Sequence, residues 1–209
     1  MRNSAKLGLT ALVAALLLAS AVSTATAGRL SSNTSGIRTT WSRLEFRSNN
    51  IFAPVFRCQV TLEGSLHSRT IVKRERSLIG AVTRADINAC TNGTLLPLRL
   101  PWHITYESFR GVLPNITGIR LLVNRAQFGF IVLGSTCLYG DREDNLTGEL
   151  EINAERLARN LVPIEGRNIA HLLEGPAGTC SSQYGLIAGN TDGLTRILGT
   201  GGQIKITLI

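Results

Sequence analysis

Residues 55–62 read VFRCQVTL, and this stretch decides the fold class of the chain. Apolar side chains at Phe56, Cys58, Val60 and Leu62 alternate with polar ones, which is the period-two pattern of a half-buried β-strand. Similar segments recur along the chain at intervals of roughly ten residues, with Gly and Pro between them. We therefore expect an all-β fold, either a β-sandwich or a related antiparallel β fold such as a barrel.

Further strands are expected wherever short apolar or alternating segments lie between turn residues. Residues 127–133 are almost wholly apolar, which predicts a strand buried on both faces. In 146–152, Leu146, Leu150 and Ile152 alternate with polar residues, so we expect one buried face and one solvated face. The remaining expected strands are 95–100, 101–106 and 119–123.

Two β-hairpins are predicted from paired apolar segments. Residues 70–73 and 78–82 flank a short charged stretch, and we expect them to pair with each other. At the end of the chain, 185–198 and 203–209 flank the glycine-rich stretch 199–202 and are also expected to pair.

One or two short helices are expected beside these strands. Thr83 and Asp86 have the spacing of a capping box, which predicts a helix from Arg84 to about Ala89. Residues 154–161 contain good helix formers but are followed closely by Pro163, so their sequence leaves helix and strand both open.

The first 27 residues have the composition of a secretion signal peptide. Arg2 and Lys6 precede the apolar run Leu7–Ala19, and Ala25–Ala27 is a small-residue cleavage site. The apolar run is shorter than the about 20 residues that a membrane-spanning helix needs. We expect a secreted or extracytoplasmic protein that begins near Gly28, with no transmembrane segment in the mature chain.

The mature chain is expected to contain a flexible lead-in over 28–36 and a single β domain over 37–209. The lead-in reads GRLSSNTSG, which is small, polar and aperiodic. The formal charge of the whole chain is +8, and removing the two basic residues of the leader leaves +6. This basic, arginine-rich balance makes an anionic cell-surface polymer or protein a plausible partner.

The four cysteines are expected to form two disulfides. An even number of cysteines in an exported chain is typical of structural disulfides, and their wide spacing argues against a zinc site. Of the three possible connectivities we favour Cys58–Cys90 with Cys137–Cys180, because sequential pairs close the shorter loops.

Four residues are weak candidates for a functional site. His103 and Glu107 have the same strand parity and could perform acid–base chemistry, but a regular strand separates them by about 13 Å. Ser65 and His67 offer a nucleophile and a base, without the surrounding motif of a serine hydrolase. For both pairs, a solvated surface position is the simpler interpretation.

No motif predicts a catalytic centre, a cofactor, a metal site or nucleic-acid binding. The glycine-rich strings near 175–202 match neither a P-loop nor a dinucleotide fingerprint. Residues 141–145 carry oxygen ligands at alternate positions, but Leu146 and Ile152 occupy positions where a calcium loop needs Gly and Glu.

The sequence therefore favours a non-enzymatic binding or structural module that works outside the membrane. The alternative is a secreted hydrolase whose active site is assembled from dispersed residues.

Four strings carry a resemblance that spans most of 55–209: FRCQVTLEGSLHSRTI, LPWHITYESFRGVLPNITGI, CLY and a final ITLI. With them the chain resembles a group of uncharacterised exported proteins of GC-rich Gram-positive bacteria. The resemblance implies export and a single β domain, and it implies no catalytic residue because the group has no assigned activity.

Overall fold

The computed structural model describes residues 29–48, 50–140, 146–164, 168–187 and 193–209. These residues form sixteen β-strands, and none of them is helical. No segment in these ranges is an apolar helix of membrane-spanning length. The predicted all-β class is confirmed, but the short helices are absent from the described part of the chain.

Eight antiparallel strands close into a barrel, so the sandwich expectation is replaced by the related barrel fold. Around the ring, each strand pairs with the next barrel strand in the chain, and the last one, β15, closes the ring between β12 and β2. Closure gives every barrel strand two hydrogen-bonded neighbours, which removes the exposed edges of an open sheet. The barrel strands are β2 (Gly36–Arg47), β3 (Phe56–Leu66), β5 (Leu78–Thr91), β7 (Trp102–Val112), β8 (Asn115–Asn124), β11 (Leu146–Ile152), β12 (Leu157–Pro163) and β15 (Gly193–Ile197).

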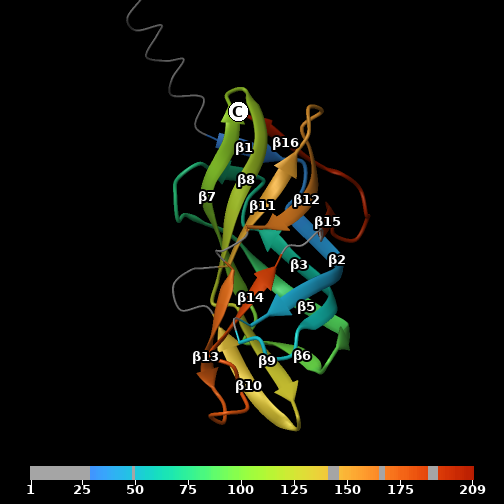
Figure 1. Cartoon of the computed structure of the whole chain (residues 1–209). Coiled ribbons are helices and arrows are strands. Elements are labelled where there is room, and N and C mark those ends of the chain that lie inside the picture. Colours follow the sequence, from blue (N-terminus) through green and yellow to red (C-terminus); the bar gives the residue numbers. More distant parts are fainter. Residues whose placement is uncertain (1–28, 49, 141–145, 165–167, 188–192) are drawn as a thin grey trace, which may run out of the picture.

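Two smaller sheets extend the barrel at its ends (Figure 1). One continues from the second half of β2, and the other continues from the first residues of β12. The first lies at the lower end of Figure 1 and contains β14 (Gln183–Ile187), β13 (Ile169–Glu174), β10 (Ser135–Gly140), β9 (Gln127–Val132) and β6 (Thr94–Leu98). The second lies at the upper end and contains β16 (Ile204–Leu208), β1 (Arg29–Ser32) and β4 (Thr70–Val72).

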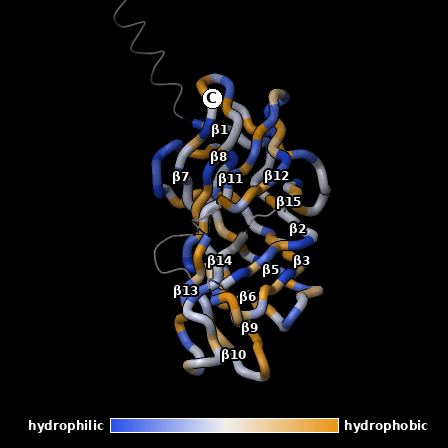
Figure 2. Tube along the Cα trace, viewed as in Figure 1, coloured by the Kyte–Doolittle hydropathy of each residue, from blue (hydrophilic) through white to orange (hydrophobic). Residues whose placement is uncertain are grey.

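The core divides into two clusters of different composition. Hydrophobic and hydrophilic residues are interspersed along the strands (Figure 2), and the buried hydrophobic side chains form these clusters. The aromatic cluster joins the lower barrel to the first sheet and includes Phe46, Phe56, Trp102, Phe128, Phe130, Tyr139 and Tyr184. The aliphatic cluster joins the upper barrel to the second sheet and includes Leu30, Leu66, Ile71, Ile79, Ile119, Leu150, Ile204 and Ile206.

Both predicted disulfides are present, with the favoured connectivity. Cys58–Cys90 links the neighbouring strands β3 and β5. Cys137–Cys180 links β10 to the segment between β13 and β14. All four cysteines belong to or pack against the aromatic cluster, so both cross-links restrain the lower half of the molecule.

The prediction of a helix from Arg84 to Ala89 is wrong, because this segment is the middle of β5. Ala85 and Ile87 lie opposite Leu62 and Val60 of β3 and pack against the aromatic cluster. Sheet pairing and burial override the local capping preference of Thr83 and Asp86. Residues 154–161, left open between helix and strand, contribute β12 from Leu157 onward.

The two predicted hairpins are not formed as ladders. β4 pairs with β1, while β5 pairs with β3 and β7. At the end of the chain β15 pairs with β12 and β2, while β16 pairs with β1 and β12. The turn near 199–202 does exist, since the Gly201 amide donates to the Ile197 carbonyl at 3.0 Å.

The prediction of a flexible lead-in over 28–36 is also wrong for residues 29–36, which the structure describes. Arg29–Ser32 form β1, which pairs on both sides, and Leu30 is fully buried in the aliphatic cluster. This strand could not be predicted from alternation because Leu30 is its one apolar residue. The signal-peptide prediction for 1–27 lies outside the described residues.

The face of β11 that was expected to be solvated is buried as well. Thr147 and Glu149 are 1% and 8% exposed. Glu149 accepts ion pairs from Arg110 at 2.8 Å and Arg120 at 3.2 Å, which compensates the burial of its carboxylate.

Candidate functional site

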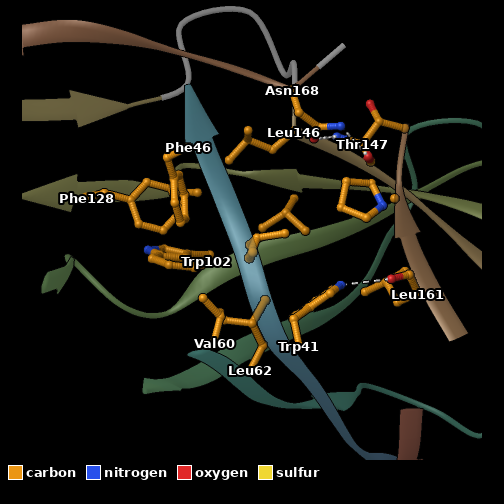
Figure 3. Close-up of a pocket in the computed structure, with 15 residues that line it drawn as sticks. Trp41, Phe46, Val60, Leu62, Trp102, Phe128, Leu146, Thr147, Leu161 and Asn168 are labelled. Carbon is orange, nitrogen blue, oxygen red and sulfur yellow. Dashed lines mark hydrogen bonds between the residues drawn. The ribbon is translucent and has the colours of Figure 1, made fainter. Parts of the chain in front are cut away.

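The candidate functional site is an apolar cavity of about 80 Å³ inside the lower barrel. Six barrel strands (β2, β3, β7, β8, β11 and β12) and the start of β9 supply most of its lining (Figure 3). Phe46, Trp102 and Phe128 lie together on one side, and Trp41 lies on the other. We call this space the aromatic cavity; Val60 and Leu62 complete its principal wall.

Ring packing fixes the aromatic side of this cavity. Trp102 meets Phe128 edge to face with ring centroids 5.0 Å apart, and Phe128 meets Phe46 at 6.0 Å. The Trp102 indole N–H donates to the Leu98 carbonyl at 2.9 Å, so its polar group is satisfied away from the cavity. The wall is therefore rigid and presents hydrocarbon surface.

Trp41 is held in position from two directions. Its indole N–H donates to the Leu161 carbonyl of β12 at 3.2 Å, shown as a dashed line in Figure 3. Gly193 of β15 lies directly against the indole, and a Cβ at that position would collide with the ring. The barrel closes around this tryptophan because β15 has no side chain there.

Asn168 seals the end of the cavity with its amide. Its oxygen accepts from the Thr147 amide at 2.8 Å, and its nitrogen donates to the carbonyls of Thr147 at 3.0 Å and Ile164 at 2.6 Å. The alternation of β11 directs the Thr147 side chain away from the face of Leu146 and Gly148. The indole and amide groups of this cavity are thus engaged, whereas the Thr147 hydroxyl is buried without a hydrogen-bond partner among the described residues. The rest of the lining is mostly apolar, which favours an apolar occupant.

A second cavity of about 70 Å³ lies above the first, inside the upper barrel. We call it the aliphatic cavity. It shares four lining residues with the aromatic cavity: Leu62, Val123, Gly148 and Leu161. A Cβ at Gly148 would lie 3.0 Å from Leu161 Cδ1, so Leu161 packs closely against the backbone of Gly148 at the shared wall.

The two threonine hydroxyls of the aliphatic cavity are hydrogen-bonded. Thr195 Oγ1 donates to the Gly193 carbonyl at 3.3 Å, and the hydroxyls of Thr39 and Thr195 lie 3.2 Å apart. Because the Thr195 proton is used on Gly193, Thr39 donates to Thr195. Both threonines are almost completely buried.

The four candidates from the sequence lie elsewhere. His103 and Glu107 are half-buried on β7, whereas Ser65 at the end of β3 and His67 just after it are exposed. Register places Ser65, Ala81 and His103 in one row across β3, β5 and β7. Two strand spacings of about 4.8 Å separate Ser65 from His103, so His103 is not within hydrogen-bond reach of the serine.

No metal-binding group of three His, Cys, Asp or Glu side chains occurs within the described ranges. Sequence reasoning singled out neither Trp41 nor Phe46. Period-two alternation places such residues on an inner face but does not reveal space between them.

In comparisons with protein-family models, curated proteins and solved structures, nothing matches this chain, and its resemblance to a group of exported proteins stays a prediction.

Proposed function

We propose that the protein is an extracytoplasmic, non-enzymatic binding protein that holds a small apolar molecule inside its barrel. The observation that carries this proposal is the aromatic cavity, whose wall is hydrocarbon and whose indole and amide groups are already hydrogen-bonded. An eight-stranded barrel is just wide enough to be filled by side chains or to enclose one small ligand.

The size of the two cavities defines the ligand class. An apolar cavity of about 150 Å³ can stay dry and bind benzene. Each cavity here is about half that size, and they adjoin at Leu62, Val123 and Leu161. A rotamer change of these side chains would join the two spaces, so we expect a single-ring aromatic or a compact branched hydrocarbon as the ligand.

Benzene, toluene and cyclohexane are suitable probes, with tryptophan fluorescence and thermal unfolding as measurements. Both tryptophans of the chain line the aromatic cavity, so occupation should change their emission. A ligand at 100 times its Kd should stabilise the fold by about 2.7 kcal/mol. Each 1 kcal/mol corresponds to a rise of about 2–4 °C in Tm.

Two variants sharpen the test. Leu161→Ala removes a side chain that lines both cavities, and it should bind benzene more tightly while losing about 3 kcal/mol of stability. Val123→Phe fills the shared wall and should abolish binding; Gly148→Ala is a milder filling variant that should weaken it. Leu133→Ala, at an exposed tip, is the control. If no probe affects the wild type or Leu161→Ala, the proposal is wrong.

A further inference from the structure

The turn between β2 and β3 exposes two large apolar side chains. Ile51 is 87% exposed and Phe52 is 90% exposed. They occupy the centre of a β-turn in which the Ala53 amide donates to the Asn50 carbonyl at 3.0 Å. The Asn50 side-chain oxygen accepts from the Phe52 amide at 3.0 Å, so the turn holds both side chains outward.

The base of this turn is fixed to neighbouring segments. Asn92 Nδ2 donates to the Val55 carbonyl at 2.8 Å, and the Ser48 hydroxyl bonds to the Ser181 hydroxyl. The projection of Ile51 and Phe52 is therefore supported from both sides of the turn. Exposed apolar side chains on a braced turn cost solvation free energy unless a partner covers them.

Three arginines surround one carboxylate at the base of the turn. Glu45 pairs with Arg57 at 2.7 Å, Arg47 at 3.3 Å and Arg43 at 3.4 Å. The glutamate side chain is 15% exposed, while those of the arginines are 36% to 60% exposed. One negative charge among three positive ones leaves a net charge of +2, presented mainly by guanidinium groups.

We propose that Ile51 and Phe52, with Arg43, Arg47 and Arg57 at their base, form a docking site for an anionic lipid surface. Guanidinium groups bind lipid phosphates, and the two apolar side chains enter the boundary between headgroups and acyl chains. A soluble polyanion would satisfy the arginines but leave Ile51 and Phe52 in water. The amino-acid composition alone favours an anionic polymer as the partner. The exposed Ile51 and Phe52 beside the arginines favour an anionic lipid surface instead.

Vesicle flotation tests this docking site with a chain that begins at Gly28 and retains all sixteen strands. We expect binding to vesicles of phosphatidylcholine with phosphatidylglycerol, and at least tenfold weaker binding to phosphatidylcholine alone. Ile51→Ser with Phe52→Ser should weaken binding at least about tenfold, because the buried apolar area is lost. Arg43→Gln with Arg47→Gln should weaken it about 25-fold, at about fivefold for each arginine.

Matched controls lie at other sites. Leu133→Ser removes an equally exposed apolar side chain from the β9–β10 tip. Arg69→Gln with Arg74→Gln removes two exposed charges from the connections beyond the opposite end of β3. Both should bind like wild type, and thermal unfolding of all variants should show an intact fold because every replaced side chain is solvent-exposed.

Three results would overturn the proposal. The first is equal binding to both kinds of vesicle, and the second is unchanged vesicle binding by the Ile51→Ser, Phe52→Ser variant. The third is retention on a soluble polyanion such as heparin with no vesicle binding, which would assign the arginines to a polymer.

Discussion

The aromatic and aliphatic clusters show two ways of stabilising the same barrel. In the aromatic cluster, Phe130 is fully buried and meets the rings of Phe46, Phe56, Tyr139 and Tyr184 at 4.8–5.8 Å. The aliphatic cluster is built almost entirely from Leu and Ile, and Tyr106 is its one aromatic member within the described ranges. The aromatic cavity borders the aromatic cluster, and the aliphatic cavity borders the aliphatic one.

Cross-linking follows the same division. Both disulfides restrain the aromatic half, whereas the aliphatic half is held by strand pairing and packing among the described residues. The two clusters remain connected because β2, β3 and β5 run through both, and Ile104 and Leu161 pack against both. Because the two halves share these strands and side chains, we expect them to unfold together although their cores differ in composition.

The largest expected effect comes from truncating the centre of each cluster. Phe130→Ala should lower the free energy of unfolding by about 4 kcal/mol and Ile204→Ala by about 3 kcal/mol, through lost contacts and the cavity created. Urea unfolding should be followed by tryptophan fluorescence, which reports on the aromatic half, and by far-ultraviolet circular dichroism, which reports on all strands. Coincident transitions are expected in both variants; separate transitions would show that the halves are independent.

A somewhat smaller effect is expected from removing the disulfides. Cys58→Ala with Cys90→Ala, and separately Cys137→Ala with Cys180→Ala, should each cost about 3 kcal/mol, because the unfolded chain regains loop entropy. The loops span 32 and 43 residues, so the second pair should cost slightly more. Thermal unfolding without reductant measures both, and unchanged Tm values would mean that packing alone holds the aromatic half.

The smallest effect concerns acid and the outer surface of β2 and β3. The hydrogen bond from Arg57, helped by the charges of Arg43 and Arg47, holds the pKa of Glu45 below its ordinary value of 4.5, although burial opposes this. A carboxyl with a lowered folded pKa contributes stability above its unfolded pKa and loses it as pH falls through the folded value.

Glu45→Gln should therefore be less stable than wild type at pH 7 by under about 1 kcal/mol, since the arginines are solvated. The difference should shrink as the pH falls below 4.5 and disappear once Glu45 of the folded wild type is protonated. Chemical denaturation at several pH values measures this, and a difference that persists at pH 2 would point to packing rather than charge.

The sequence pattern predicted those features of the fold that depend on neighbouring residues in the chain. Alternation identified the strands around Val60, Ile119 and Leu150. An even number of widely spaced cysteines, in a chain expected to be exported, predicted two disulfides, and loop length favoured the pairing that the structure contains. The helix at Arg84–Ala89 failed because its pairing partner, β3, lies more than twenty residues earlier in the chain. A capping box carries no information about a distant strand.

The candidate site was beyond prediction for a related reason. Trp41, Trp102 and Leu161 come from three strands that are far apart in sequence, and the cavity is the space left when they meet. Ser65 and His67 attracted attention as neighbours in sequence, although the structure leaves both exposed at the end of β3.

The sequence by itself determined that the chain forms strands, which face of most of them is apolar, and which cysteine pairing closes the shorter loops. Side-chain alternation and loop length are local quantities, so they can be read along the chain. Only the tertiary structure decided that β15 joins β12 to β2 and turns the sheet into a closed barrel. Closure depends on the combined twist and register of eight strands, and the shape of the enclosed space follows from it.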